Sequence, residues 1–242
     1  ALAMMKTSLR TILTFLTDLV FPRTCALCGM RLGLREHCVC LECGQLLPRY
    51  DELFYHASER LLGSPLFRSL SAPFTYQHGS AGYKLIIALK YQGYAEVADF
   101  IVRTALTEGR LQPALGSIDF ILPVPIEDTR LEKRGYNQAA LLAQALSTHY
   151  YHVPCREDFL LRHRKSHSQT TLHREERMEN ARKAFYLTPR RKLLDELKGK
   201  RILLVDDILT TGSTLLSLCD LLESCGVREV HVFVSAVALP RL

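Results

Sequence analysis

Two neighbouring acids and a hydroxyl-rich turn form the most distinctive chemical pattern in the sequence. Asp206 and Asp207 follow the apolar run 202–205. The turn after them contains Thr210, Thr211, Gly212, Ser213 and Thr214. Backbone N–H groups at the start of a helix favour a phosphate, glycine lets the main chain approach it, and carboxylates accept hydrogen bonds from a vicinal diol. The pattern predicts a ribose 5-phosphate site; the alternative is a threonine-capped helix beside a solvated acid pair.

Cysteines near the N-terminus have the spacing of a metal site. Two Cys-x2-Cys pairs lie eleven residues apart: Cys25 and Cys28, then Cys40 and Cys43. Four such thiolates can surround Zn²⁺ at about 2.3 Å and leave no coordination position for a substrate. We therefore predict a structural zinc in a zinc-ribbon-like module over residues 23–50, used for packing or partner contact. Two alternatives stay open: Cys38 replaces Cys40 as a ligand, or the thiols are core residues or disulfides.

Alternating strands and helices in residues 118–242 are expected to position the acids and the turn. The expected strands span 118–125, 159–162, 184–187, 201–205 and 229–238, and the expected helices span 137–149 and 213–225. Strands separated by helices indicate an α/β fold with a parallel sheet flanked by helices. Ligands of such sheets bind at the carboxyl ends of the strands, where the acids lie.

The segments before this domain have less distinctive patterns. Residues 51–117 are predicted to be a linker or a hood-like helical segment. Residues 1–22 are interpreted as an expression scar followed by an amphipathic helix, because the apolar stretch 9–22 is too short to cross a bilayer and Asp18 interrupts it. A helix lying on a membrane surface is the alternative. We expect a cytoplasmic protein with no membrane span.

Composition excludes several classes of protein. Hydrophobic residues make up 48% and charged residues 23%, which argues against a disordered chain, a collagen-like fibre and a polytopic membrane protein. The formal net charge of +6 is compatible with an anionic ligand or nucleic acid. The sequence contains no Trp, so a stacking site built on indole is excluded.

The motifs together resemble a known family. Residues 202–214 match the phosphoribosyl-pyrophosphate (PRPP) signature of type I phosphoribosyltransferases position by position. Further motifs resemble the ComF/GntX family, which includes ComFC-like competence proteins. They are Phe21-Pro22 with the cysteine pairs, residues 88–91, 123–125 and 134–138, and Gln169 ahead of Arg177 and Asn180. The resemblance extends from about Phe21 to Ala238 and implies a type I phosphoribosyltransferase fold with an N-terminal four-cysteine zinc module.

The resemblance also implies roles for particular residues. Asp206 and Asp207 would hold the ribose 2- and 3-hydroxyls, and the turn 210–214 would bind the 5-phosphate. The loop after 123–125 would face pyrophosphate, with Arg134 as a charge contact. Mg²⁺ would be held mainly by oxygens of the ligand. The stretch 165–183, with Lys165, would correspond to the flexible catalytic loop. Tyr76, Tyr83 and Lys90 are assigned to the hood.

The basic segment 162–183 allows three interpretations. It contains seven Lys and Arg and three Glu, a net charge of +4. It is predicted to be a lid over pyrophosphate, a contact for the backbone of single-stranded DNA, or a solvated loop.

The sequence as a whole leaves three candidate functions. The first is a Mg²⁺-dependent phosphoribosyltransferase of ComF type linked to DNA uptake. The second is a PRPP-binding protein that handles single-stranded DNA, and the third is a non-catalytic adaptor for a protein partner such as another competence protein.

Overall fold

The protein is represented by a computed structural model that describes residues 22–91, 95–112, 116–163 and 184–239. The helix expected over residues 9–22 lies outside this range except for Pro22. The basic segment also lies outside it, except for Arg162, His163 and its flank from Ala184 onward. In the described part of the chain, no helix has the length and hydropathy needed to cross a membrane.

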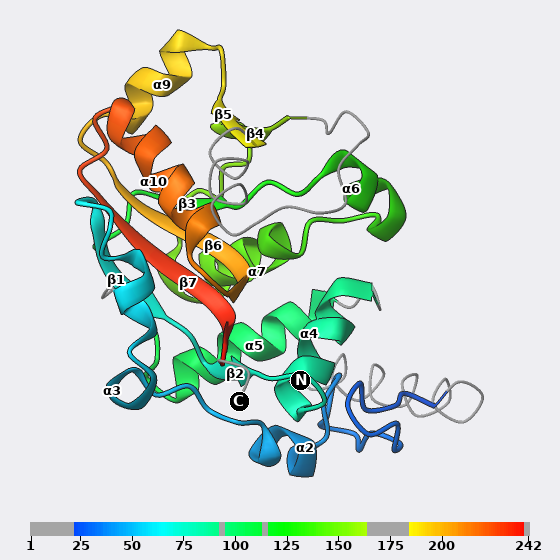
Figure 1. The fold of residues 1–242 in the computed structure, drawn as a ribbon. Helices are drawn as coiled ribbons and strands as arrows, with labels where there is room; N and C mark the ends of the chain where they lie inside the picture. The colour runs from blue at the N-terminus through cyan, green and yellow to red at the C-terminus, as the bar shows by residue number, and fades with distance from the viewer. Residues whose placement is uncertain (1–21, 92–94, 113–115, 164–183, 240–242) are drawn as a thin grey trace, which may run out of the picture.

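A parallel sheet forms the centre of the molecule (Figure 1). The strand order is β1-β7-β6-β3, and β2 continues the pairing along β7. The strands are β1 (Phe67–Ser71), β2 (Phe74–Tyr76), β3 (Phe120–Pro123), β6 (Arg201–Leu209) and β7 (Glu229–Ala238). Every pair among them is parallel, and most residues of β6 and β7 are buried. Burial on both faces explains why these strands have continuous apolar runs.

Helices cover both faces of the sheet, and successive residues of β6 serve opposite faces. Leu203 and Val205 belong to the hydrophobic cluster beneath α4 (Ala81–Tyr91), α5 (Ala95–Thr107) and α7 (Gln138–Leu146). Ile202 and Leu204 belong to the cluster beneath α9 (Arg191–Leu197) and α10 (Ser213–Ser224). The α/β fold with a parallel sheet flanked by helices is therefore confirmed (Figure 1).

Short elements connect these layers. They are α2 (Leu41–Leu46), α3 (Glu52–Tyr55), the 3₁₀ helix η1 (Ala57–Leu61), α6 (Asp128–Arg134), the π-helical turn η2 (Ser147–Tyr151), β4 (Leu160–Arg162) and β5 (Phe185–Leu187). β4 and β5 pair antiparallel in a sheet of their own, so the strands expected near residues 160 and 186 do not join the parallel sheet. In this pair Arg162 lies opposite Phe185, and Leu160 lies opposite Leu187.

Other boundaries also differ from the sequence-based expectation. β6 extends to Leu209 because its last residues keep pairing with β7, so both acids lie within the strand rather than after it. The helix expected over 137–149 changes from α-helix to the π-helical turn after Leu146. The segment 51–117 does supply the helices α4 and α5, and it also supplies β1 and β2, which were not predicted.

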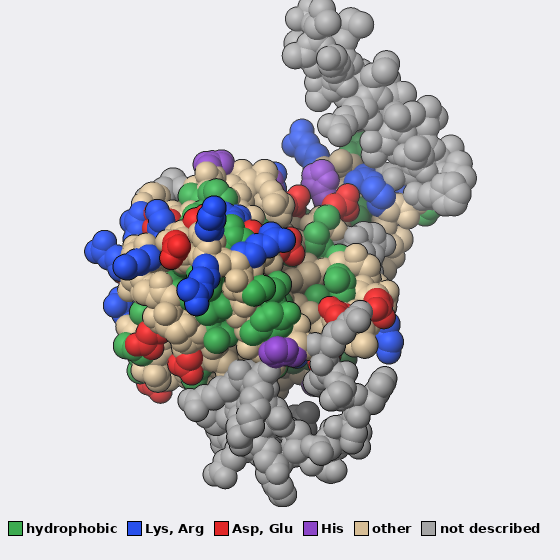
Figure 2. Space-filling view, turned by 90° about the horizontal axis from the view of Figure 1, so that it is seen from above, with side chains coloured by type: hydrophobic (Ala, Val, Ile, Leu, Met, Phe, Trp, Pro, Cys, Tyr) green, Lys and Arg blue, Asp and Glu red, His purple; other side chains and the backbone are tan. Residues whose placement is uncertain are grey.

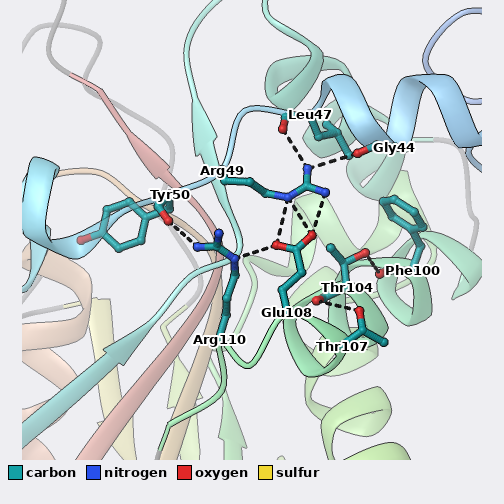
Figure 3. Close-up of polar contacts among 9 residues, drawn as sticks. All are labelled: Gly44, Leu47, Arg49, Tyr50, Phe100, Thr104, Thr107, Glu108 and Arg110. Atoms are coloured by element: carbon teal, nitrogen blue, oxygen red, sulfur yellow. Dashed lines mark hydrogen bonds and ion pairs between the residues drawn. The ribbon is translucent and has the colours of Figure 1, made fainter.

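A pair of guanidinium groups joins the cysteine-containing segment to the rest of the molecule (Figure 3). Arg49 Nη2 lies 2.7 Å from Glu108 Oε1, and Arg110 Nε lies 2.7 Å from Glu108 Oε2. Arg49 also donates to the carbonyl oxygens of Gly44 and Leu47 at 3.1 and 2.8 Å. Residues 44–49 are thereby fixed to the end of α5, which makes the cysteine module part of the same folded unit.

Replacing Gly82 in α4 by alanine is expected to destabilise the protein. A Cβ at this position would lie 2.1 Å from the carbonyl oxygen of Thr75, so β2 or α4 would have to move. We expect the free energy of unfolding to fall by about 1–3 kcal/mol, as overpacking does elsewhere. Gly44→Ala in α2 is the matched control, because its Cβ would meet only Phe100 at 3.7 Å. Urea unfolding of both variants tests this, and equal stability would contradict the close packing of α4 on β2.

Glu108→Gln is expected to destabilise the protein at neutral pH and not at low pH. Burial raises the pKa of Glu108, but the guanidinium groups of Arg49 and Arg110 outweigh burial and hold the pKa below its ordinary value. A lowered folded-state pKa gives stability that is present above the unfolded-state pKa and is lost as the pH falls. We expect a loss of about 1 kcal/mol at pH 7 that disappears near pH 3. Glu132→Gln, at an exposed position in α6, should have little effect at either pH in the same unfolding measurements.

Candidate functional site

The acid pair lies on the part of β6 that extends past the end of its neighbouring strand β3. β3 ends at Pro123, opposite Val205, so Asp206 and Asp207 extend beyond it while β6 still pairs with β7. The turn that follows leads into α10, and Gly212 precedes the helix with a φ of 82°. A Cβ on Gly212 would lie 2.7 Å from the carbonyl oxygen of Arg60, so both backbone angle and space require glycine.

A small hollow lies between the acid and the turn. Its lining includes Asp206, Thr210, Gly212, Ser213 and Thr214. The hydroxyl oxygens of Thr211 and Ser213 are 3.0 Å apart at the start of α10. The positive end of this 12-residue helix therefore faces a cavity that also carries a carboxyl group. Such a cavity can hold a phosphate beside neutral hydroxyl groups.

Arg60 in η1 fixes the beginning of the turn, a function that sequence reasoning missed. Its Nη1 donates to the carbonyl oxygens of Leu209, Thr210 and Ala238 at 3.4, 2.8 and 3.0 Å. The guanidinium thus holds the ends of β6 and β7 together from a segment about 150 residues earlier in the chain. No local motif around Arg60 indicates these contacts.

The acid pair is surrounded by groups that offset its charge. Gln138 Nε2 and Lys90 Nζ both contact Asp207 Oδ2, at 2.9 and 3.0 Å. Asp206 Oδ1 accepts a hydrogen bond from the N–H of Asp207 at 2.8 Å. Burial and the adjacent charge of Asp207 raise the pKa of Asp206 to about 8, against the opposing effects of that N–H, Lys90 and Arg162. The pair therefore carries less than two negative charges at neutral pH, and a protonated carboxyl can donate as well as accept.

The other predicted site residues do not contact the acids directly in the described part of the structure. Arg134, at the end of α6, lies over the Tyr91 ring at 4.8 Å and donates to Gln138 Oε1 at 2.9 Å, so it reaches Asp207 only through Gln138. Tyr76 and Tyr83 contact each other with ring centroids 5.6 Å apart. Lys165 lies outside the described residues.

Arg162 is a mainly buried residue rather than a free surface cation. Its guanidinium lies over the Phe185 ring at 5.0 Å and contacts Glu127 Oε1 at 3.4 Å. Its side chain is 22% exposed, and its charge acts on Asp206. This position favours a role at the acid pair over a role as a contact for a DNA backbone.

The four cysteines of the two Cys-x2-Cys pairs form a cluster in the N-terminal module. Their sulfur atoms all lie within 4.8 Å of one another, and Cys28 Sγ is 3.9 Å from Cys40 Sγ. The N–H groups of Leu27 and Cys40 point to Cys25 Sγ at 3.4 Å each. Sulfur ligands at about 2.3 Å from a tetrahedral ion would be separated by comparable distances. The cluster could therefore hold a metal ion such as zinc.

The fifth thiol of this region, Cys38, points away from the cluster. Its Sγ donates to the carbonyl oxygen of Glu96 at 3.3 Å, and burial raises the pKa of the thiol to about 12. The pKa of Cys43 is also raised, by burial and by the neighbouring sulfurs. Several thiolates in one cluster repel each other, and a divalent cation would remove this repulsion. Cys40 rather than Cys38 completes the group of four.

Comparison with known proteins identifies the family. Residues 117–239 match the family described as "Phosphoribosyl transferase domain". DNA utilization protein YhgH of Escherichia coli O157:H7 is 30% identical over 227 residues, which cover 89% of this chain and 97% of that protein. Competence protein F of Haemophilus influenzae is 38% identical over 113 residues, 47% of this chain and 48% of that protein. Competence protein ComFC of Bacillus subtilis is 28% identical over 192 residues, 79% of this chain and 68% of that protein.

Several features of the molecule agree with this family. The acid pair, the Thr-Gly turn and the strands β3, β6 and β7 all fall inside the matched residues. The relation to YhgH covers 89% of this chain and 97% of that protein, so it extends beyond residues 117–239. The chain therefore belongs to the phosphoribosyl transferase domain family and, within it, to the ComF-like proteins.

Proposed function

We propose that this protein binds PRPP together with Mg²⁺ at the carboxyl end of β6. The single observation that carries the proposal is the close association of Asp206 with the helix-initiating turn 210–214 around one hollow. In this arrangement the acids accept hydrogen bonds from the ribose hydroxyls. The N–H groups and hydroxyls of the turn bind the 5-phosphate.

Mg²⁺ would be shared between the protein site and the ligand. In the described ranges, the cysteines form the one group of three or more potential metal-ligating side chains, so no carboxylate cage surrounds the hollow. The oxygens of PRPP would therefore supply most ligands of the ion, which would neutralise the departing pyrophosphate. Arg134 and Lys165 are proposed to contribute positive charge to the same pyrophosphate.

Phosphoribosyl transfer is the reaction that such a site would support. The residues of this chain would orient the ribose and stabilise the charge of pyrophosphate as its bond to C1 breaks. The acceptor would enter next to α4, on the side of the hood-like segment. A ComF-type role in DNA uptake or use is proposed from the relatives named for competence and DNA utilization.

The alternative is a PRPP-binding adaptor that contacts single-stranded DNA or a protein partner without turnover. Figure 2 looks onto the end of the molecule where α9 lies and shows many Lys and Arg side chains on its left part. The exposed cations of this region include Arg190, Arg191, Lys192 and Lys198. A positive face of this kind favours a polyanionic partner, which is why the DNA-binding alternative is kept.

The double substitution Asp206→Asn with Asp207→Asn is expected to abolish PRPP binding. Each lost hydrogen bond to a charged acceptor is worth about 1.5–3 kcal/mol, so affinity should fall roughly 100-fold or more. Calorimetric titration with PRPP and Mg²⁺ measures the effect, and Asp195→Asn, at an exposed position in α9, is the control. Unchanged affinity of the double variant would reject the site. PRPP binding without pyrophosphate release across a panel of bases and amide donors would favour the adaptor.

We propose zinc as the ion of the cysteine cluster, with a structural role. A closed set of four thiolates fits Zn²⁺ and leaves no position for chemistry. Buried side chains of the module, such as Leu27, Leu32 and Leu47, pack into the cluster beneath α4, α5 and α7. Metal binding would add to this packing by fixing the two Cys-x2-Cys turns to each other.

Removal of the metal is expected to loosen the module. Elemental analysis should find about one zinc per chain in the wild type and in Cys38→Ala, and none in Cys40→Ala. A strong chelator should lower the melting temperature of the wild type and should leave that of Cys40→Ala unchanged. Zinc retained by Cys40→Ala and lost from Cys38→Ala would instead make Cys38 the fourth ligand.

A further inference from the structure

The two oxygen atoms of Asp207 have different surroundings. Oδ2 receives both contacts described above, from Gln138 at 2.9 Å and from Lys90 at 3.0 Å. None of the hydrogen bonds or ion pairs among the described residues uses Oδ1. The carboxylate is therefore held by one oxygen, while the other can accept a hydrogen bond from a ligand.

Burial makes this arrangement specific. The side chains of Lys90 and Asp207 are 20% and 11% exposed, so the ion pair is weakly screened by water. Gln138 is oriented in turn by Arg134, which donates to its Oε1 at 2.9 Å. Since a guanidinium only donates, this contact leaves the amide NH₂ of Gln138 to face Asp207. Both partners of Oδ2 are thus fixed before a ligand arrives.

Lys90 comes from a part of the chain that the family match does not include. α4 precedes the matched residues 117–239, and it contacts β2 and β7 beside the end of β6. Figure 1 shows α4 below the end of the sheet to which β6 and β7 lead. The charged groups that face the acid pair are Lys90 from α4 and Arg162 from β4, with Arg134 behind Gln138. Of these, Lys90 is the one that contacts Asp207 directly.

We propose that Lys90 is a positioning residue for the sugar: together with Gln138 it holds Asp207 by Oδ2 and presents Oδ1 to the ribose 2-hydroxyl. The inference rests on the proposed PRPP site and adds to it a residue from the hood-like segment. Without the ammonium group of Lys90, Oδ2 of Asp207 is held by Gln138 alone. The carboxylate of Asp207 can then rotate away from the hydroxyl. The contribution of Lys90 should therefore appear only with ligands that carry this hydroxyl.

The test compares ribose 5-phosphate with 2-deoxyribose 5-phosphate by calorimetric titration of the full chain. The wild type should prefer the ribose compound by about 10-fold or more, the value of a hydrogen bond to a charged group. Lys90→Met should reduce this preference to less than about 3-fold, whereas Lys90→Arg should retain part of it, because the positive charge is kept although the guanidinium is larger than the ammonium. Lys84→Met is the matched control, since Lys84 is exposed on the same helix, and it should behave like the wild type.

Distinct outcomes separate this inference from the proposed function. A wild type that binds neither PRPP nor ribose 5-phosphate would reject the proposed function itself. A wild type that binds PRPP, with Lys90→Met keeping the full preference for ribose, would reject only the role of Lys90. An equal loss of affinity for both sugars in Lys90→Met, with a lowered melting temperature, would make Lys90 merely structural. Combining Lys90→Met with Asp207→Asn should weaken ribose binding no further than Asp207→Asn alone.

Discussion

Repulsion between two carboxyl groups at the buried end of one strand is the constraint on which the site depends. Asp206 and Asp207 are adjacent, and burial together with the charge of Asp207 raises the pKa of Asp206. Side chains from three other elements offset this repulsion: the ammonium of Lys90 from α4, the guanidinium of Arg162 from β4 and the amide of Gln138 from α7. The folded structure thus offsets the charge of the acid pair with groups from three other elements, and this receptor is preorganised for the ligand proposed above.

The local parts of this receptor could be predicted from sequence, and its long-range parts could not. The acids with the turn, and each Cys-x2-Cys pair, are continuous motifs, so residue types and spacing predicted which residues lie together, while the ligands that they bind stay a prediction. Arg60, Lys90 and Gln138 reach the site across 149, 117 and 69 residues of chain. Lys90 and Gln138 lie in motifs that the sequence analysis singled out, but those motifs do not indicate that the two side chains contact Asp207. Only the packing of η1, α4 and α7 against the ends of the sheet brings them there.

The choice between Cys38 and Cys40 illustrates the same limit. Spacing alone left both thiols as possible ligands, although a Cys-x2-Cys pair favours Cys40. The fold separates them, because the chain turns so that Cys38 faces the backbone of α5 at Glu96. The short strands β1 and β2 were missed for a related reason: at five and three residues they carry too little periodicity to be distinguished from a loop, and their pairing with β7 creates them.

These long-range contacts change how the segment before residue 117 should be understood. It supplies two strands to the sheet, a guanidinium to the turn 210–214 and an ammonium to the acid pair. Gly212 lets the backbone of Arg60, in this segment, lie close to the turn, and Gly82 lets α4 lie close to β2 within the segment; a Cβ at either glycine would clash with a carbonyl oxygen. A segment so closely packed cannot be exchanged for a different hood without disturbing the receptor itself. The cysteine-containing segment then acquires a function, because Cys38 and Arg49 fix the two ends of α5, and α5 packs against the helix α4 that carries Lys90.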